Sequence, residues 1–241
     1  YSVDLVLTDK DPAIERDVLR RLRDRKTDGI ILFPINEGPE FEAFLRSLGT
    51  PLVTVCNRLS DDWDYVGIHD RQAMKEATQH VLERGYRHLV YICPPLAYRG
   101  VTNIYTQEER YQGFLEAVEA HRPEIGITVI EDRQYLAALD ALPLTGSKTA
   151  IMCSCDAYAL EVLHYLRERR LRVPEDVGLI GFDHIDMLKY VQPQLTTVEY
   201  NVELMGREAV RLLLERIEAG PGAAERREKI VEYAMIAGSS L

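Results

Sequence analysis

The stretch VPEDVGLIGFD, residues 173–183, is the part of the chain that best indicates the fold. Its apolar run Val177–Phe182 has the length and composition of a strand that is buried on both faces. A proline precedes the run, and Asp183 follows it directly. The stretch therefore predicts a buried parallel strand whose carboxyl end presents a carboxylate.

Short apolar runs of the same kind alternate with helix-length amphipathic segments along the chain. Asp11 and Pro12 suit the start of a helix as N-cap and first helical residue, and apolar residues then recur at steps of three and four. This alternation predicts an α/β protein with parallel sheets covered by helices on both faces. The predicted strands are Val3–Leu7, Gly29–Phe33, Pro51–Val55, His88–Cys93, Ile127–Ile130, Thr149–Cys153, Val177–Phe182 and Glu228–Ile236.

Composition excludes several classes of protein. The 241 residues carry a formal charge of −10, which disfavours binding to nucleic acid through this part of the chain. The apolar runs are far too short to span a bilayer. The four cysteines have no zinc-ligand spacing, so we expect reduced thiols in a cytoplasmic protein.

The motifs of common catalytic and nucleotide sites are absent. There is no glycine-rich dinucleotide fingerprint, no P-loop and no nucleophile elbow. The cluster Asp183-His184-Ile185-Asp186 could bind a metal, but it is more typical of a loop at a strand end. We therefore expect no cofactor and no metal. An α/β enzyme using Asp183 or Asp186 is an alternative without a base–nucleophile pair to support it.

Polar residues follow several of the predicted strands. They are Asn57-Arg58, Asp70, Cys155-Asp156 and Asp183. In open α/β sheets, ligands bind at the carboxyl ends of the strands. Carboxylates that accept hydrogen bonds from hydroxyls, together with an arginine that donates them, suit a neutral polyol.

Several motifs, in their order and spacing, resemble the LacI/GalR family of transcription regulators over nearly the whole chain. The resemblance implies a periplasmic-binding-protein-like fold of type I, with two doubly wound parallel-sheet lobes and a hinged cleft. The motifs are Thr27–Leu32, Thr50–Val55 with Asn57-Arg58, Ala77–His88, Glu109–Phe114, Val173–Asp183, Pro193–Val198 and Met205–Ala209.

The same resemblance implies lobes that are interrupted in the sequence. We expect an N-lobe of residues 1–95 and 201–222 and a C-lobe of residues 96–200 and 223–241. Tyr1–Leu5 resembles the family's second strand, so we expect the chain to be a fragment that lacks the first strand and helix as well as the DNA-binding headpiece.

The resemblance also implies positions for ligand binding. Arg110 matches the arginine of the family's Arg-x-x-Gly-Phe motif, and Asp183 matches a carboxylate that holds sugar hydroxyls. Asp70 lies at the matching acidic position, and Cys155 replaces a frequent asparagine. Further candidates are Thr106, one helical turn before Arg110, Tyr135 as a stacking residue, and Tyr200 near a lobe crossover. For Tyr135 and Tyr200, ordinary packing is the alternative.

The implied function is non-enzymatic. We expect an effector-sensing domain that binds a small polar molecule, such as a sugar, and couples closure of its cleft to DNA binding by a homodimer. The dimer would form through N-lobe and C-lobe faces, and DNA would be bound only through the headpiece. The alternative is the sugar-binding subunit of an ABC importer. The sequence does not identify the effector.

Overall fold

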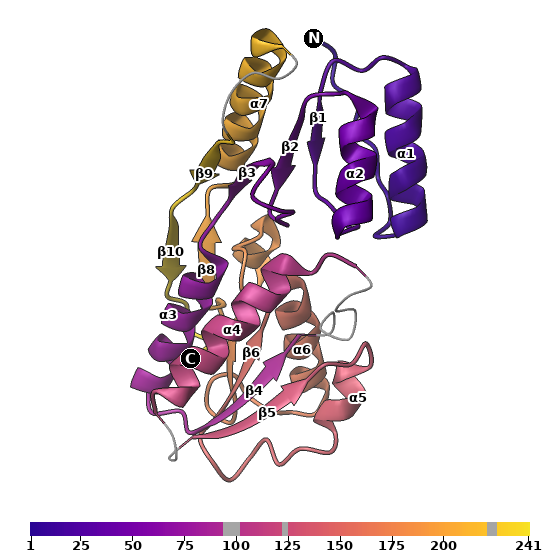
Figure 1. Ribbon diagram of the computed structural model, residues 1–241. Coiled ribbons are helices and arrows are strands. Elements are labelled where there is room, and N and C mark those ends of the chain that lie inside the picture. The colour runs from indigo at the N-terminus through magenta and orange to yellow at the C-terminus, as the bar shows by residue number, and fades with distance from the viewer. Residues whose placement is uncertain (94–101, 122–124, 221–225) are drawn as a thin grey trace. The chain divides into compact units, whose positions relative to one another are not determined.

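The structure of the protein is a computed structural model that describes residues 1–93, 102–121, 125–220 and 226–241 (Figure 1). The described residues form two compact units. Unit 1 contains residues 1–68, 102–106, 202–220 and 226–231, and unit 2 contains residues 69–93, 107–121, 125–201 and 232–241. Each unit has helices packed on a parallel sheet, so the predicted α/β class is confirmed. Among the described residues, no helix is long and apolar enough to cross a membrane.

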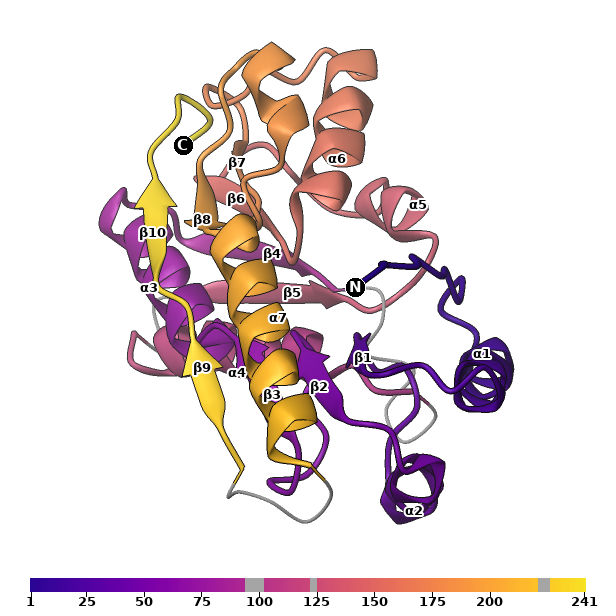
Figure 2. The ribbon, with the colours of Figure 1, turned by 90° about the horizontal axis from the view of Figure 1, so that it is seen from above.

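Unit 1 is built on a four-stranded parallel sheet with the order β1-β2-β3-β9. Its helices α1 and α2 pack together, and α7 packs on β1, β2 and β3 (Figure 2). As predicted, Asp11 caps α1, because its carboxylate accepts hydrogen bonds from the N–H groups of Ala13 and Ile14. The elements are α1 (Pro12–Asp24), β1 (Ile30–Leu32), α2 (Pro39–Leu48), β2 (Leu52–Val55), β3 (Asp64–Gly67), α7 (Val202–Ala219) and β9 (Glu228–Ile230).

Asp64 connects three elements of unit 1. Its side chain is fully buried and accepts hydrogen bonds from Arg216 on α7 at 2.6 and 3.0 Å. The backbone N–H of Arg227, just before β9, donates to it at 2.8 Å. Burial by itself raises the pKa of Asp64, but these bonds and the two arginine charges lower it overall. The carboxylate thus fixes α7 and β9 to β3.

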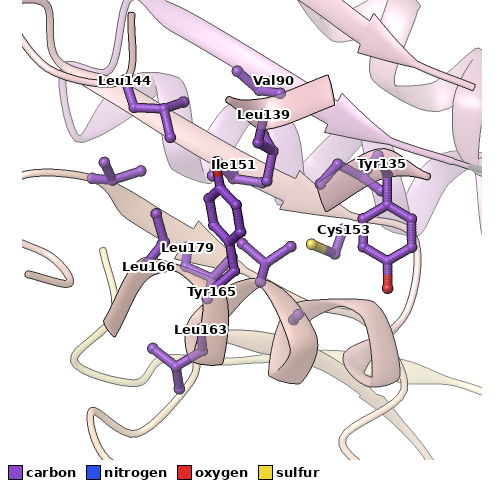
Figure 3. Close-up of a cluster of buried hydrophobic side chains, with 14 of the residues drawn as sticks. Val90, Tyr135, Leu139, Leu144, Ile151, Cys153, Leu163, Tyr165, Leu166 and Leu179 are labelled. Carbon is purple, nitrogen blue, oxygen red and sulfur yellow. The ribbon is translucent and has the colours of Figure 1, made fainter. Parts of the chain in front are cut away.

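Unit 2 has the parallel sheet β5-β4-β6-β7 and the antiparallel pair β10-β8. Successive residues of β4 face opposite sides of the sheet. Tyr91 stacks on Phe114 of α4, whereas Val90 and Ile92 belong to a core that also contains residues of α5 and α6. Figure 3 shows Val90 in this core with Leu139 and Leu163. The elements are α3 (Asp70–Glu83), β4 (His88–Ile92), α4 (Tyr105–Glu119, which begins in unit 1), β5 (Gly126–Ile130), α5 (Tyr135–Leu139), β6 (Thr149–Cys153), α6 (Asp156–Glu168), β7 (Gly178–Ile180), the 3₁₀ helix η2 (Asp186–Tyr190), β8 (Thr197–Tyr200) and β10 (Tyr233–Ile236).

Two predicted strands differ from the structure. Val3–Leu7 forms no strand, since it pairs with no other described segment, and Val3 is 91% exposed. A strand needs a neighbour for its backbone hydrogen bonds, and a short apolar run alone does not supply one. The predicted strand Glu228–Ile236 is two strands, β9 and β10, separated at Val231-Glu232, where the chain passes from unit 1 to unit 2.

The lobe boundaries also need correction. The expected boundaries at 95/96 and 222/223 lie outside the described residues. However, residues 69–93, expected in the N-lobe, belong to unit 2, and residues 226–231, expected in the C-lobe, belong to unit 1. The physical reason is strand pairing: β4 is hydrogen-bonded between β5 and β6, and β9 is hydrogen-bonded to β3. The remaining crossover follows Asn201, one residue after the expected position.

Candidate functional site

Arg110 is the centre of a buried polar network in unit 2. The residue is 5% exposed. Its Nε donates to Oδ1 of Asp70 at 2.7 Å, and its Nη1 donates to the carbonyl oxygen of Ser154 at 2.7 Å and to Oδ1 of Asp183 at 3.1 Å. Three acceptors from three separate segments therefore surround one guanidinium.

The fold explains why these residues meet. Asp70 is the first residue of α3, Ser154 follows β6 directly, and Asp183 follows β7 after two further residues. Neighbouring parallel strands β6 and β7 end at the same edge of their sheet. The predicted polar strand end Asp183 thus lies beside the Ser154 carbonyl, which was not predicted, and Arg110 reaches both from α4.

Two aromatic rings complete the network. The Arg110 guanidinium carbon lies 3.7 Å from the ring centroid of Phe182, a stacking distance at which a cation is attracted to an aromatic face. The Tyr200 hydroxyl donates to Oδ1 of Asp183 at 3.1 Å. The rings of Phe182 and Tyr200 are themselves 6.3 Å apart. The guanidinium is therefore fixed in its plane as well as at its edges.

The network is rich in negative charge. Burial raises the pKa values of Asp70 and Asp183, and the charge of Arg110 offsets only part of that effect. Burial lowers the pKa of Arg110, but the two carboxylates outweigh it, so the guanidinium stays charged. Two carboxylates thus share one cation, and a further anion would be repelled here, whereas hydroxyl groups could donate to the carboxylates.

Asp183 is presented by a strained turn. Its backbone φ is +109°, and that of His184 is +50°. Residues other than glycine rarely adopt positive φ angles. The N–H of Asp183 donates to the carbonyl of Val198 at 2.9 Å, and the N–H of Ile185 donates to Asp156 at 3.0 Å. Strain of this kind costs about 1–3 kcal/mol per residue and persists only where the surroundings hold it.

Asp156 is the residue that holds this turn. It is fully buried, and its second carboxylate oxygen accepts from the Thr197 hydroxyl at 2.8 Å. Burial raises its pKa to about 6, against the opposing effect of the bonds from Thr197 and Ile185. The sequence predicted a polar residue at this strand end but gave no indication that its role is to position Asp183.

Gly113 allows α3 to approach α4. A Cβ atom at this position would lie 2.0 Å from the backbone carbonyl oxygen of Arg71, the residue next to Asp70. No side chain fits at that distance. This contact explains the glycine in the Arg-x-x-Gly-Phe motif, because the close approach of the two helices places Asp70 beside Arg110.

The structure does not bring all seven sequence candidates together. Arg110, Asp70, Asp183 and Tyr200 form the network, and Cys155, half-buried at the N-cap of α6, is near enough for the charges of Asp183 and Arg110 to influence its thiol. The other two candidates have other hydrogen-bond partners.

Thr106 belongs to unit 1. Its N–H and its hydroxyl both donate to Oδ1 of Asn57, at 3.2 and 3.1 Å. Tyr135 is buried in the hydrophobic core of unit 2, where its hydroxyl donates to Glu161 and its ring packs edge-on against Tyr158. Conversely, sequence analysis missed Phe182 and the Ser154 carbonyl. A backbone acceptor has no sequence signature, but Phe182 is the residue directly before Asp183.

Within the described residues, no group of three or more His, Cys, Asp or Glu side chains could hold a metal ion. His184, from the cluster considered above, contacts Glu199 instead, at 3.0 Å. All four cysteines are described, and they are free thiols.

The chain matches known proteins over most of its length. The family model of the periplasmic binding protein-like domain matches residues 78–241, more than half of the chain. This chain belongs to that family. The relatives and solved structures that it matches include LacI-type transcription regulators, which confirms the resemblance to that family seen in the sequence.

The relatives are named as transcription regulators. The HTH-type transcriptional repressor PurR of Haemophilus influenzae (strain PittEE) is 31% identical, with 90% of this chain and 65% of the relative covered. The ribose operon repressor of Halalkalibacterium halodurans is 29% identical, with 92% and 65% covered. The chain thus spans 65% of the length of these two relatives.

Solved structures share the fold. The CelR–cellobiose complex is 27% identical, with a TM-score of 0.79 over 95% of this chain and 71% of that one. A LacI-type regulator from Alkaliphilus metalliredigens, complexed with D-xylulofuranose, is 24% identical, with a TM-score of 0.83 over 100% of this chain and 87% of that one.

Gly113→Ala is expected to destabilise unit 2 by about 3 kcal/mol, because the new methyl group would push α3 and α4 apart. The matched control is Gly206→Ala on α7, where a Cβ would meet no atom within 4 Å. The control should raise stability by about 0.5–1 kcal/mol, the ordinary gain of alanine over glycine in a helix. Urea unfolding followed by circular dichroism measures both, and equal effects of the two variants would contradict the close approach.

The stability of the protein is expected to depend on the ionisation of Asp156. Its pKa is about 6 in the folded state and 3.8 ordinarily, so the folded state binds the proton more tightly. The contribution of Asp156 to stability is therefore greatest below about pH 4 and is lost as the pH rises to 6, at no more than about 1.4 kcal/mol per pH unit.

Unfolding free energies of the wild type and Asp156→Asn from pH 4.5 to 7.5 test this expectation. The unfolding free energy of the wild type minus that of Asp156→Asn should decrease as the pH rises to about 6 and then stay constant. Asp140→Asn is the control: hydrogen bonds from Arg169 and Tyr165 lower the pKa of Asp140 below its ordinary 3.8, so its contribution to stability should stay constant over this pH range. A pH-independent difference for Asp156→Asn would contradict the assignment.

Proposed function

We propose that this chain is the effector-sensing part of a LacI-type transcription regulator and that its effector is a neutral polyhydroxylated molecule, a sugar, held by the Arg110 network. The observation that carries the proposal is the exposure of Asp183. Its side chain is 24% exposed, whereas those of Asp70 and Arg110 are 2% and 6% exposed. Asp183 is thus the charged member of the network that a ligand can reach.

The carboxylate of Asp183 can accept a further hydrogen bond, which suits a hydroxyl donor. Among the described residues, both hydrogen bonds to this carboxylate, from Arg110 and Tyr200, end on Oδ1. Its Oδ2 is left to accept from a ligand. The excess of carboxylates favours an uncharged donor over a sugar phosphate or another anion. The cellobiose bound to CelR, a 27% identical structure, supports a sugar as the ligand class.

The expected ligand can be found by calorimetry with cellobiose, D-ribose, D-xylose and D-ribose 5-phosphate. One of the neutral sugars should bind, and Asp183→Asn should weaken its binding at least about tenfold, or 1.4 kcal/mol, because a carboxylate acceptor is lost. The matched control is Asp186→Asn, an exposed carboxylate three residues along, which should bind as the wild type does. Binding of the phosphate alone, or equal binding by both variants, would refute the proposed site.

Regulation of DNA binding is a function of the whole protein, and our proposal for it is supported by the names of the relatives. We infer that a longer chain carries a DNA-binding headpiece, forms a homodimer in the cytoplasm, and has a DNA affinity that depends on the sugar. The names of the relatives favour this function over that of an importer subunit.

The full-length protein provides the test of regulation. A sugar that binds should change its affinity for DNA from its own promoter several-fold, the size of a coupling free energy of about 1–3 kcal/mol. Asp186→Asn should keep this response and Asp183→Asn should lose it. A full-length protein that binds the sugar but no DNA would instead support the importer function.

A further inference from the structure

Unit 2 contains a cavity that the proposed sugar site does not include. It has a volume of about 450 Å³, within the range of about 300–1,000 Å³ usual for small-molecule sites. It lies at the carboxyl-terminal end of α6, where the chain turns toward β7. Cys155 and Asp156 are at the other end of this 13-residue helix, and Leu163, the lining residue nearest to them along α6, is about 10 Å from Asp156 at 1.5 Å per residue. A molecule in the cavity would therefore not touch Asp183.

The floor of the cavity is apolar. It is formed by Leu163 of α6, Leu171 and Val173 of the following loop, and Pro193. Leu163 is 2% exposed, and Leu171 and Val173 pack against the same hydrophobic core. This floor could bury the apolar body of a ligand without leaving a polar group unpaired.

The rim of the cavity is rich in arginine. Arg167, Arg170 and Arg172 line it, with Glu175 as the acidic group. Arg172 is held by two hydrogen bonds to Asp176, both at 3.0 Å, so its charge is compensated.

Arg167 and Arg170 differ from Arg172. Neither guanidinium has a hydrogen-bond or ion-pair partner among the described residues. The carbonyl groups of residues 165–167, near the end of α6, already accept hydrogen bonds from the N–H groups of residues 169–171. In a chain with a net charge of −10, two unpaired guanidiniums over an apolar floor form a distinct environment.

We propose that this cavity is a second binding site, which takes a small organic anion. The ligand would carry a phosphate or carboxylate group joined to an apolar ring or short chain. Arg167 and Arg170 would bind the anionic group, since a guanidinium donates two parallel hydrogen bonds to such oxygens. The apolar part would lie on Leu163, Leu171 and Pro193. The site has the opposite charge preference to the network around Arg110.

The probe is phenyl phosphate, and its binding is measured by calorimetry at low salt. Phenol and inorganic phosphate, which represent its two halves, and benzoate, its carboxylate analogue, are measured in the same way. Phenyl phosphate or benzoate should bind at least tenfold more tightly than either half molecule. The double variant Arg167→Ala/Arg170→Ala should lose at least tenfold in affinity for the tighter of the two probes. Both arginines are exposed, so this variant should fold as the wild type does, which circular dichroism checks.

Arg21→Ala/Arg25→Ala is the matched control, with the same loss of charge at two exposed arginines of unit 1. It should bind the probe as the wild type does, as should Asp183→Asn. The proposal is overturned if neither probe binds, if inorganic phosphate binds as tightly as phenyl phosphate, or if the two double variants weaken binding equally. Loss of the probe in Asp183→Asn would also overturn it, by placing the anion at the other site.

Discussion

A buried guanidinium must be surrounded by acceptors, and unit 2 is arranged around this requirement at Arg110. An unpaired charge in the interior would cost several kcal/mol, so α3, the end of β6 and the end of β7 must each deliver an acceptor to it. Asp70, Ser154 and Asp183 do so. The same three bonds that stabilise the arginine also leave one carboxylate, that of Asp183, at the surface.

This arrangement strains the backbone at Asp183, and contacts from neighbouring residues stabilise the strained turn. Asp183 lies in a strained turn, and buried Asp156 fixes that turn through Ile185 and Thr197. Gly181 is needed beside it, because a Cβ there would lie 2.0 Å from the Asp156 carboxylate. Helix α6 therefore supports an acidic site at its first turn, while arginines collect at its last. One helix thus separates two surfaces of different charge.

The local elements of the fold could be predicted from the sequence because their causes are local. The apolar run Val177–Phe182 contains β7, and Asp11 caps α1 through its own side chain. Val3–Leu7 shows the limit of this approach, since its apolar run predicts a strand but no described segment pairs with it. The lobe boundaries were misplaced for the same reason: which sheet β4 or β9 joins depends on strands distant in the sequence.

For the site, the sequence by itself determined which chemical groups are present: an arginine in a family motif and carboxylates at strand ends. Only the tertiary structure decided which of them meet. Arg110, Asp70 and Asp183 converge from positions up to 113 residues apart in the chain, whereas Thr106, one turn from Arg110, bonds to Asn57, and Tyr135 packs into the core. The reason is physical. Side-chain chemistry is encoded residue by residue, but the neighbours of a buried charge are set by the packing of whole helices and sheets.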